Sequence, residues 1–317
     1  MKVVVAGLFP EETKERMRAC FPEAWCVRIA APAEAEGELS DAEVLIPEHM
    51  RVDAALLKKA PRLKLIQTGA GYDNVDLAAC AARGIELCHA PGINADAVAE
   101  HVMAFLLCWY KNLLYLDGGL KAHRAVGELR YTGAELSGKT IGIVGLGRVG
   151  QRVAALCGAF GMRVLGCGGR AGTVPGVEPR ELDALCRESD AVSLHVPLSE
   201  STRHLIDAGM LARMKPEALL INTSRGAVVD EEALILALRQ GEIGGACLDV
   251  FEEEPLPVGS PLRDLPNVIL TPHTAGLPDG PGFHQKRYAF FARNIRKLMD
   301  GERPEGRVEL PRTGELP

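Results

Sequence analysis

Short apolar runs alternate with helical patterns along nearly the whole chain. In the first part we predict strands, separated by helices, at residues 2–6, 44–46, 63–67 and 85–88. A long helix is expected to begin at Asn94, because asparagine is a favoured N-cap residue and Val98 and Val102 follow at helical spacing. Such alternation of strands and helices is typical of parallel α/β architecture.

A second series of strands begins near residue 139. The predicted strands are 141–145, 163–166, 191–196, 219–222, 246–250 and 268–270. Parallel strands in this number, with helices between them, correspond to a complete doubly wound dinucleotide-binding fold. A last helix, 283–299, lies beyond that fold, and we expect it to pack back on the first domain. The predicted fold class is therefore α/β, with two domains.

Length and charge narrow the possible functions. The chain has 317 residues, a length typical of two domains, and its 36 Lys and Arg against 42 Asp and Glu give a net charge of 36 − 42 = −6. A mildly acidic chain has no general positive field with which to bind nucleic acid or an anionic membrane. No apolar run approaches the ~20 residues that a membrane-spanning helix needs.

The nine cysteines are scattered, and none forms a C-x-x-C pair. Thiols in this arrangement are typical of reduced core residues rather than of disulfides or a zinc site. We therefore predict a cytosolic protein whose site contains no metal.

A glycine motif follows the first strand of the second series. Gly145, Gly147 and Gly150 form a G-x-G-x-x-G pattern between a predicted strand and an apolar helix. The first glycine permits a tight turn, the second lets the backbone approach a pyrophosphate, and the third allows close packing of helix on strand. A glycine-rich turn without a ligand is the alternative, but the order strand, turn and helix favours dinucleotide binding.

The residues at the end of the next strand indicate whether the site binds NAD or NADP. An NAD site usually carries an acidic residue about 20 positions after the glycine motif, to hold the ribose hydroxyls. Here Gly168, Gly169 and Arg170 occupy that position. A guanidinium can bind a 2′-phosphate that a carboxylate would repel. We therefore predict that NADP is preferred and that NAD is possible; the alternative is that Arg170 is only a solvated loop charge.

Three further motifs each follow a predicted strand of the second domain. Arg225 lies in the first, Glu254 in the second and His273 in the third. The carboxyl ends of parallel strands meet at the edge of the sheet where such folds bind ligands. An arginine, a carboxylate and an imidazole are thus expected to converge there. Taken singly, Arg225 could be an ion-pair partner, Glu254 a solvated loop acid and His273 a structural residue.

These motifs together resemble a known family. The matching segments are 69–76, 94–101, 136–147, 195–198 and the three motifs above. The chain is similar to the D-2-hydroxyacid dehydrogenases, the group of phosphoglycerate dehydrogenases and of glyoxylate and hydroxypyruvate reductases. The resemblance implies a flavodoxin-like substrate domain built from both chain ends, a central Rossmann domain, and a homodimer. The expected boundaries are 1–98 and 284–317 for the substrate domain and 99–283 for the Rossmann domain.

The resemblance also implies a role for each site residue. His273 would be the acid/base, Glu254 would orient it, and Arg225 would bind the carboxylate and carbonyl of a 2-keto acid. The backbone amides of Ala70 and Gly71 would bind the remaining carboxylate oxygen. The expected cofactor-binding residues are Gly145, Gly147, Arg148, Val149, Gly150, Gly169, Arg170, His195, Pro197, Thr202, Thr223, Asp249 and Gly276.

The expected activity is hydride transfer from NAD(P)H to a small 2-keto acid such as glyoxylate or hydroxypyruvate, giving the D-2-hydroxy acid. Phosphoglycerate or phosphite dehydrogenases of the same fold are alternatives, as is a non-catalytic, nucleotide-sensing protein similar to the corepressors built on this scaffold. A formate dehydrogenase is disfavoured, because that branch pairs its histidine with glutamine where this chain has Glu254. The sequence departs from the family after Gly276, where two prolines and two glycines are expected to delay the last helix.

Overall fold

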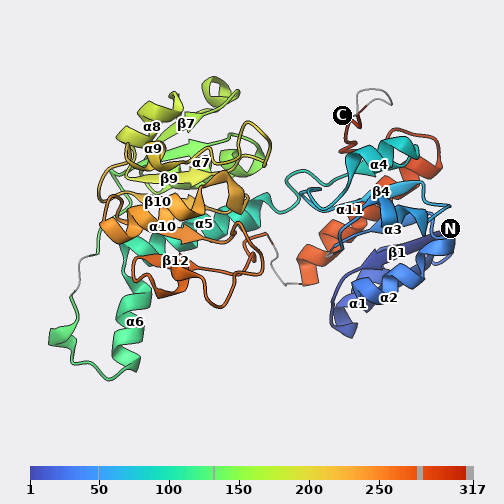
Figure 1. The fold of residues 1–317 in the computed structure, drawn as a ribbon, viewed down its shortest axis with the longest axis horizontal. Helices are drawn as coiled ribbons and strands as arrows, with labels where there is room; N and C mark the ends of the chain where they lie inside the picture. The colour runs from blue at the N-terminus through green and yellow to red at the C-terminus, as the bar shows by residue number, and fades with distance from the viewer. Residues whose placement is uncertain (49, 131–132, 277–280, 312–317) are drawn as a thin grey trace. The chain divides into compact units, whose positions relative to one another are not determined.

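The computed structural model describes residues 1–48, 50–130, 133–276 and 281–311, which form two units (Figure 1). One unit comprises Met1–Ile93 and Asp279–Pro317, and the other comprises Asn94–Pro278. Each unit is built on one parallel sheet, of five strands in the first and seven in the second. The predicted fold class is confirmed: both chain ends build the flavodoxin-like unit, and the central part builds the doubly wound one. The chain passes from the first unit to the second between Ile93 and Asn94, directly before the long helix. This is five residues earlier than the predicted boundary at 98 (98 − 93 = 5).

The sheet of the first unit has the strand order β2-β1-β3-β4-β5, which is the flavodoxin-like order. The strand β2 was not predicted, because it lies at the edge of the sheet and Ile29 is its only buried residue. A half-exposed edge strand lacks the continuous apolar run that marks a buried parallel strand. The bounds are β1 Lys2–Ala6, β2 Cys26–Ala30, β3 Val44–Ile46, β4 Leu65–Gln67 and β5 Glu86–Cys88.

The C-terminal helix α11 (Pro281–Met299) packs on this sheet, as predicted. Its side chains Tyr288, Phe291 and Ile295 are fully buried in one core cluster with Val3 of β1. The helix begins two residues before the predicted start at 283, because proline is tolerated in the first turn, where no intrahelical N–H bond is lost. The other helices of the unit are α1 Glu11–Arg18, α2 Pro32–Gly37, α3 Ala54–Lys58 and α4 Leu77–Ala82.

The sheet of the second unit has the order β12-β11-β10-β9-β6-β7-β8. The strand order reverses between β6 and β9, which is where such sheets bind ligands at their carboxyl ends. Six strands were predicted and seven are present: β8 was missed, because it is an edge strand of three residues that ends in exposed Glu178 and Pro179. The bounds are β6 Thr140–Val144, β7 Arg163–Cys167, β8 Val177–Pro179, β9 Ala191–Leu194, β10 Leu219–Asn222, β11 Gly245–Leu248 and β12 Val268–Leu270.

Helices cover both faces of this sheet. The helices α5 and α7 share one core cluster with Leu219 and Ile221 of β10, whereas α8 and α10 share the other with Leu220. Alternate residues of a strand point to opposite faces, so two separate cores follow from one strand. As predicted, α5 begins directly after Asn94. The helices are α5 Ala95–Tyr110, α6 Leu113–Lys121, α7 Arg148–Ala159, α8 Leu182–Glu188, α9 Ala208–Leu211 and α10 Glu231–Gln240.

Short 3-10 helices complete the described parts of both units. They are η1 Leu39–Asp41, η2 Val126–Glu128, η3 Ala171–Thr173, η4 Gly226–Val228 and η5 Pro261–Asp264. Among the helices of the described residues, none is both long and apolar enough to span a bilayer.

Candidate active site

Three adjacent strands of the second unit bring the predicted catalytic residues to one edge of the sheet. Arg225 follows β10, Glu254 lies in the loop after β11, and His273 follows β12. Because β10, β11 and β12 are neighbours and parallel, their carboxyl ends lie side by side. The sheet therefore gathers residues that are far apart along the chain.

His273 and Glu254 form a direct pair. The Nδ1 atom of His273 lies 2.6 Å from Oε2 of Glu254, with 47% and 33% of the two side chains exposed. The hydrogen bond that His273 donates to Glu254 raises the pKa of His273, against the opposing effects of burial and of the positive charge of Arg225. Burial alone would raise the pKa of Glu254, but the bond to His273 and the charges of His273 and Arg225 lower it overall. The pair thus favours a protonated imidazole, and Nε2 lies on the side of the ring away from Glu254.

The loop that carries Arg225 is held by a buried asparagine. The side chain of Asn222 is 1% exposed, donates to the carbonyl of Arg225 at 2.9 Å and accepts from the amide of Ser224 at 3.0 Å. The next residue, Gly226, approaches the β11 loop so closely that a Cβ there would lie 1.9 Å from the backbone carbon of Phe251. Glycine is therefore required where the loops of Arg225 and Glu254 meet. Asn222 stands three positions before Arg225 in the sequence, but only the structure assigns it this role.

Asp249 fixes the residues on either side of His273. Its carboxylate accepts from the hydroxyl of Thr271 at 2.6 Å and from the amides of Thr274 and Ala275 at 2.8 and 2.9 Å. The hydroxyl of Thr271 also lies 3.0 Å from Nε2 of His101, in α5. Asp249 was predicted to contact the cofactor; its side chain is 1% exposed and already accepts three hydrogen bonds within the protein. His101 received no role from the sequence, although its segment belongs to a recognised motif.

The glycine motif forms an open turn at the start of α7. Gly145 has a φ of 95°, and a Cβ there would lie 2.7 Å from the carbonyl oxygen of His195. At Gly150 a Cβ would lie 2.0 Å from the carbonyl oxygen of Gly145, whereas at Gly147 it would meet nothing within 4 Å. The space over Gly147, together with the N-terminus of a 12-residue helix that begins with Arg148 and Val149, fits a pyrophosphate.

The next candidate cofactor-binding residues lie in the loops that follow β7 and β9, at the same carboxyl edge of the sheet. Gly169 and Arg170 are exposed after β7. His195, at the end of β9, lies 2.9 Å from the hydroxyl of Ser193, and burial lowers its pKa to about 4, so it is neutral at physiological pH. The hydroxyl of Thr202 donates to the carbonyl of Pro197 at 2.7 Å and so holds that loop together.

Two of the predicted cofactor-binding residues, Thr223 and Gly276, lie near the catalytic loops and have different surroundings. The hydroxyl of Thr223 is buried and has no hydrogen-bond partner within the described part of the chain. A buried polar atom of this kind needs a partner, which a bound ligand could provide after a small local shift. Gly276 packs against the start of α5, since a Cβ there would lie 2.3 Å from the side-chain nitrogen of Asn94.

The turn predicted to bind a carboxylate lies in the first unit, after β4. The carbonyl of Gly69 accepts from the amide of Ala90 at 2.8 Å, and the carbonyl of Ala70 lies 3.0 Å from Nδ1 of His89. The amides of Ala70 and Gly71 donate to no residue that the structure describes. A turn whose carbonyls are bound elsewhere while adjacent amides stay available can bind an anion.

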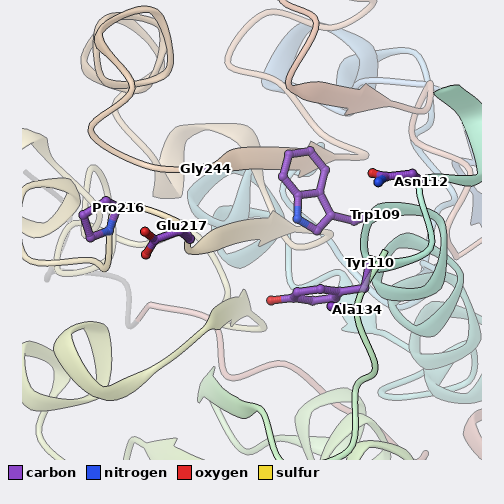
Figure 2. Close-up of a pocket in the computed structure, with 7 residues that line it drawn as sticks. All are labelled: Trp109, Tyr110, Asn112, Ala134, Pro216, Glu217 and Gly244. Carbon is purple, nitrogen blue, oxygen red and sulfur yellow. The ribbon is translucent and has the colours of Figure 1, made fainter. Parts of the chain in front are cut away.

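A separate pocket lies at the opposite, amino edge of the seven-stranded sheet. It has a volume of about 400 Å³. Figure 2 shows Trp109 and Tyr110, from the end of α5, across from Pro216 and Glu217, which precede β10. Because the catalytic residues lie at the carboxyl edge, this pocket is not part of the candidate active site.

Both the sequence and the structure are similar to those of known proteins. Residues 103–275 match a family model described as D-isomer specific 2-hydroxyacid dehydrogenase, NAD binding domain. The chain is 40% identical over 267 residues to a glyoxylate reductase of Thermofilum pendens, a match that covers 81% of this chain and 78% of that protein. It is 38% identical over 318 residues to glyoxylate/hydroxypyruvate reductase B of Klebsiella pneumoniae, with 94% of each covered. The solved D-lactate dehydrogenase of Aquifex aeolicus, complexed with NAD and lactic acid, matches with a TM-score of 0.82 and 31% identity over 95% of this chain and 96% of that chain.

Proposed function

The chain belongs to the D-isomer specific 2-hydroxyacid dehydrogenase family, and on that premise we propose that it reduces glyoxylate or hydroxypyruvate to the corresponding 2-hydroxy acid, which has the D configuration where the product is chiral. The family makes it a nicotinamide-dependent oxidoreductase. The observation that carries the proposal is the 2.6 Å pair of His273 and Glu254 beside Arg225, at the carboxyl edge of the sheet. Reduction of a 2-keto acid needs a proton donor, an anchor for the carboxylate and a source of hydride; reduced nicotinamide supplies the hydride when it is bound.

His273 is the proposed proton donor. Glu254 holds Nδ1, so Nε2 is the ring nitrogen left to protonate the carbonyl oxygen of the substrate. The pKa of His273 is raised by its hydrogen bond to Glu254, which favours the protonated imidazole that an acid in the reductive direction requires. In the reverse direction the same nitrogen accepts the proton of the hydroxyl group. Asp249 keeps this geometry by accepting from the hydroxyl of Thr271 and from the amide of Thr274, on the two sides of His273.

Arg225 is the proposed anchor. A planar guanidinium can donate to a carboxylate oxygen and to the neighbouring carbonyl oxygen together, which polarises the carbonyl for hydride addition. Asn222 and the close contact of Gly226 with Phe251 hold its backbone in place before substrate arrives. We assign the second carboxylate oxygen to the amides of Ala70 and Gly71.

The proposed cofactor site lies in the second unit. Gly145, Gly147 and Gly150 would hold the pyrophosphate at the start of α7. The nicotinamide end would lie near Thr223, Asp249 and Gly276, and His195, Pro197 and Thr202 would line the adenosine side. We therefore propose that the second unit, Asn94–Pro278, binds the cofactor and that the first, Met1–Ile93 with Asp279–Pro317, binds the substrate. These bounds differ by five residues from the predicted 99–283 and 1–98 with 284–317.

NADP is the proposed preferred cofactor. Replacing Arg170 by alanine should lower kcat/KM for NADPH about tenfold or more and leave that for NADH nearly unchanged, because only NADPH carries the 2′-phosphate that charge-assisted hydrogen bonds would hold. Steady-state kinetics with both nucleotides measures this. Arg239→Ala, which removes an exposed arginine in α10, is the matched control. An equal loss for both nucleotides, or no loss, would exclude the assignment.

A homodimer is the proposed assembly. Exposed apolar side chains gather on α6 and η2, where α6 extends away from the sheet of its own unit (Figure 1). Contiguous exposed apolar groups commonly mark a protein interface. The side chains in question are Leu113, Leu114, Tyr115, Leu120 and Val126, whose exposed fractions run from 43% to 77%.

The proposed location is the cytosol. All nine cysteines are free thiols in the structure. Burial raises the pKa of Cys157 and Cys88 to about 12, so these thiols stay protonated and unreactive. Unpaired thiols of this number are typical of a reducing compartment.

Steady-state kinetics across a panel of keto acids tests the proposed activity. We expect turnover of glyoxylate and hydroxypyruvate, with a higher kcat/KM for NADPH than for NADH. The phosphorylated analogue 3-phosphohydroxypyruvate separates the proposal from phosphoglycerate dehydrogenase activity. Tight binding of NADPH with no turnover of any keto acid would instead indicate a nucleotide-sensing protein.

A further inference from the structure

A buried polar cluster at the carboxyl edge of the five-stranded sheet has no part in the mechanism above. It consists of Glu48, which follows β3, and of Arg287 and Tyr288 in α11. An Nη2 hydrogen of Arg287 bonds to Oε2 of Glu48, and the hydroxyl of Tyr288 donates to Oε1 of Glu48 at 2.6 Å. The side chains of Arg287 and Glu48 are only 8% and 5% exposed.

Stability alone does not account for this cluster. Burying two charges costs solvation energy, and well-packed apolar residues in place of a buried ion pair are often equally or more stable. The Nε–H group of Arg287 is also buried without a partner among the described atoms. An unsatisfied buried donor is a further cost. A cluster that costs free energy in this way is explained better by what the guanidinium of Arg287 contacts.

Arg287 lies directly against the turn proposed to bind the substrate carboxylate. A Cβ on Gly69 would lie 2.5 Å from Nη2 of Arg287 and 3.3 Å from its Cζ. The φ of Gly69 is not in the left-handed region that favours glycine. A side chain at position 69 would therefore have to displace the guanidinium, which Glu48 and Tyr288 hold in place.

The helix α11 also binds the end of β4, which leads into the turn 69–71. Asn294 follows Arg287 by seven residues, about two helical turns, and so lies on the same face of α11. Its side-chain nitrogen donates to Oε1 of Gln67 at 2.8 Å, and the side chain of Gln67 donates in turn to the carbonyl of Thr68 at 2.9 Å. The segment 67–69 is thus fixed by two polar residues of α11.

We propose that Arg287 is a positioning residue for the carboxylate-binding turn 69–71. Glu48 and Tyr288 fix the guanidinium, and the guanidinium packs against Gly69, while Ala90 and His89 hold the carbonyls of Gly69 and Ala70. This contact sets the direction in which the amides of Ala70 and Gly71 point. The inference rests on the proposed function, because it assigns Arg287 to the binding of a substrate carboxylate.

Replacing Arg287 by methionine tests this role. The KM for glyoxylate should rise about tenfold, while kcat and the KM for NADPH stay within about twofold, because loss of an interaction made equally in the ground and transition states raises KM alone. Lys286→Met removes the same charge from the neighbouring, exposed position of α11 and should change none of these constants. An unchanged KM for glyoxylate, or a loss confined to kcat, would overturn the proposal.

A double-mutant cycle separates positioning from general destabilisation. Gly69→Ala alone should raise the KM for glyoxylate, because the new methyl group displaces the guanidinium or the turn. Methionine at position 287 ends short of the Nη atoms and leaves room for that methyl group. The double variant should therefore bind glyoxylate no worse than Arg287→Met alone, a non-additive result. Fold-changes that multiply independently would contradict the direct contact.

Two further measurements keep the outcomes distinct. Circular dichroism reports whether each variant folds; if Arg287→Met does not, Arg287→Lys replaces it in the cycle, since lysine keeps the charge but lacks the planar fork. The wild-type protein is assayed first. Absence of keto-acid turnover in the wild type contradicts the proposed function, whereas normal wild-type turnover with unaffected Arg287 variants contradicts only the positioning role.

Discussion

Replacing His273 by glutamine should lower kcat for glyoxylate reduction about 10³-fold, within the range found for loss of a general acid. Glutamine keeps the size and a hydrogen bond to Glu254 but cannot donate a proton to the carbonyl oxygen. NADPH should still bind, because the glycine turn at the start of α7 is untouched. Stopped-flow or steady-state assays measure the rate, and a fluorescence titration measures NADPH binding.

The chain offers a matched control for this substitution. His204 also lies 2.6 Å from a carboxylate, that of Glu252, but this pair belongs to the surface of the unit and has no place in the mechanism. His204→Gln should leave kcat within about twofold, since a surface ion pair contributes little. Turnover of the His273→Gln variant near the wild-type level would remove His273 as the acid.

Replacing Arg225 by lysine should lower kcat/KM for glyoxylate about 10²- to 10³-fold, the size of effect seen when one preorganised donor to a developing negative charge is removed. An ammonium group keeps the charge but cannot donate to carboxylate and carbonyl oxygens in one plane. The guanidinium also donates to the carbonyl of Ser224 at 2.7 Å, a bond that the substitution would change. The loop would still be held by Asn222 and by the contact of Gly226 with Phe251, which do not involve the guanidinium.

Kinetics of the lysine variant with saturating NADPH gives the measurement. Arg239→Lys, at an exposed position of α10, is the control and should behave as the wild type. A kcat/KM for the Arg225→Lys variant within a few-fold of the wild type would show that charge alone suffices, and the bidentate role would then be wrong.

Both predictions depend on loops that are ordered by their own hydrogen bonds. Asp249 binds residues on both sides of His273, and Asn222 binds the carbonyl of Arg225. Catalytic donors that are already oriented need no reorganisation when charge develops on the substrate. We therefore expect the paired imidazole and carboxylate to persist in the absence of substrate.

The strands that the sequence failed to predict share one property. Both β2 and β8 are edge strands, and a strand paired on one side only can expose much of its length. The buried strands carry continuous apolar runs because helices cover both of their faces. An edge strand without such a run is recognised only by its hydrogen-bonded neighbour, which the sequence does not display.

The sequence by itself determined that Arg225, Glu254 and His273 end up at one edge of a sheet. Each follows an apolar strand, and parallel strands share their carboxyl edge. It also determined the glycine turn, because the tight turn and the close approach of helix to strand admit only residues without a side chain.

The family resemblance implied that Glu254 orients His273, and the tertiary structure supplies the distance of 2.6 Å between the two side chains. Only the tertiary structure shows that Arg287 packs against Gly69, more than 200 positions away along the chain. Periodicity and local propensity report which face of an element is buried, whereas a contact between two particular side chains depends on how distant segments pack against each other.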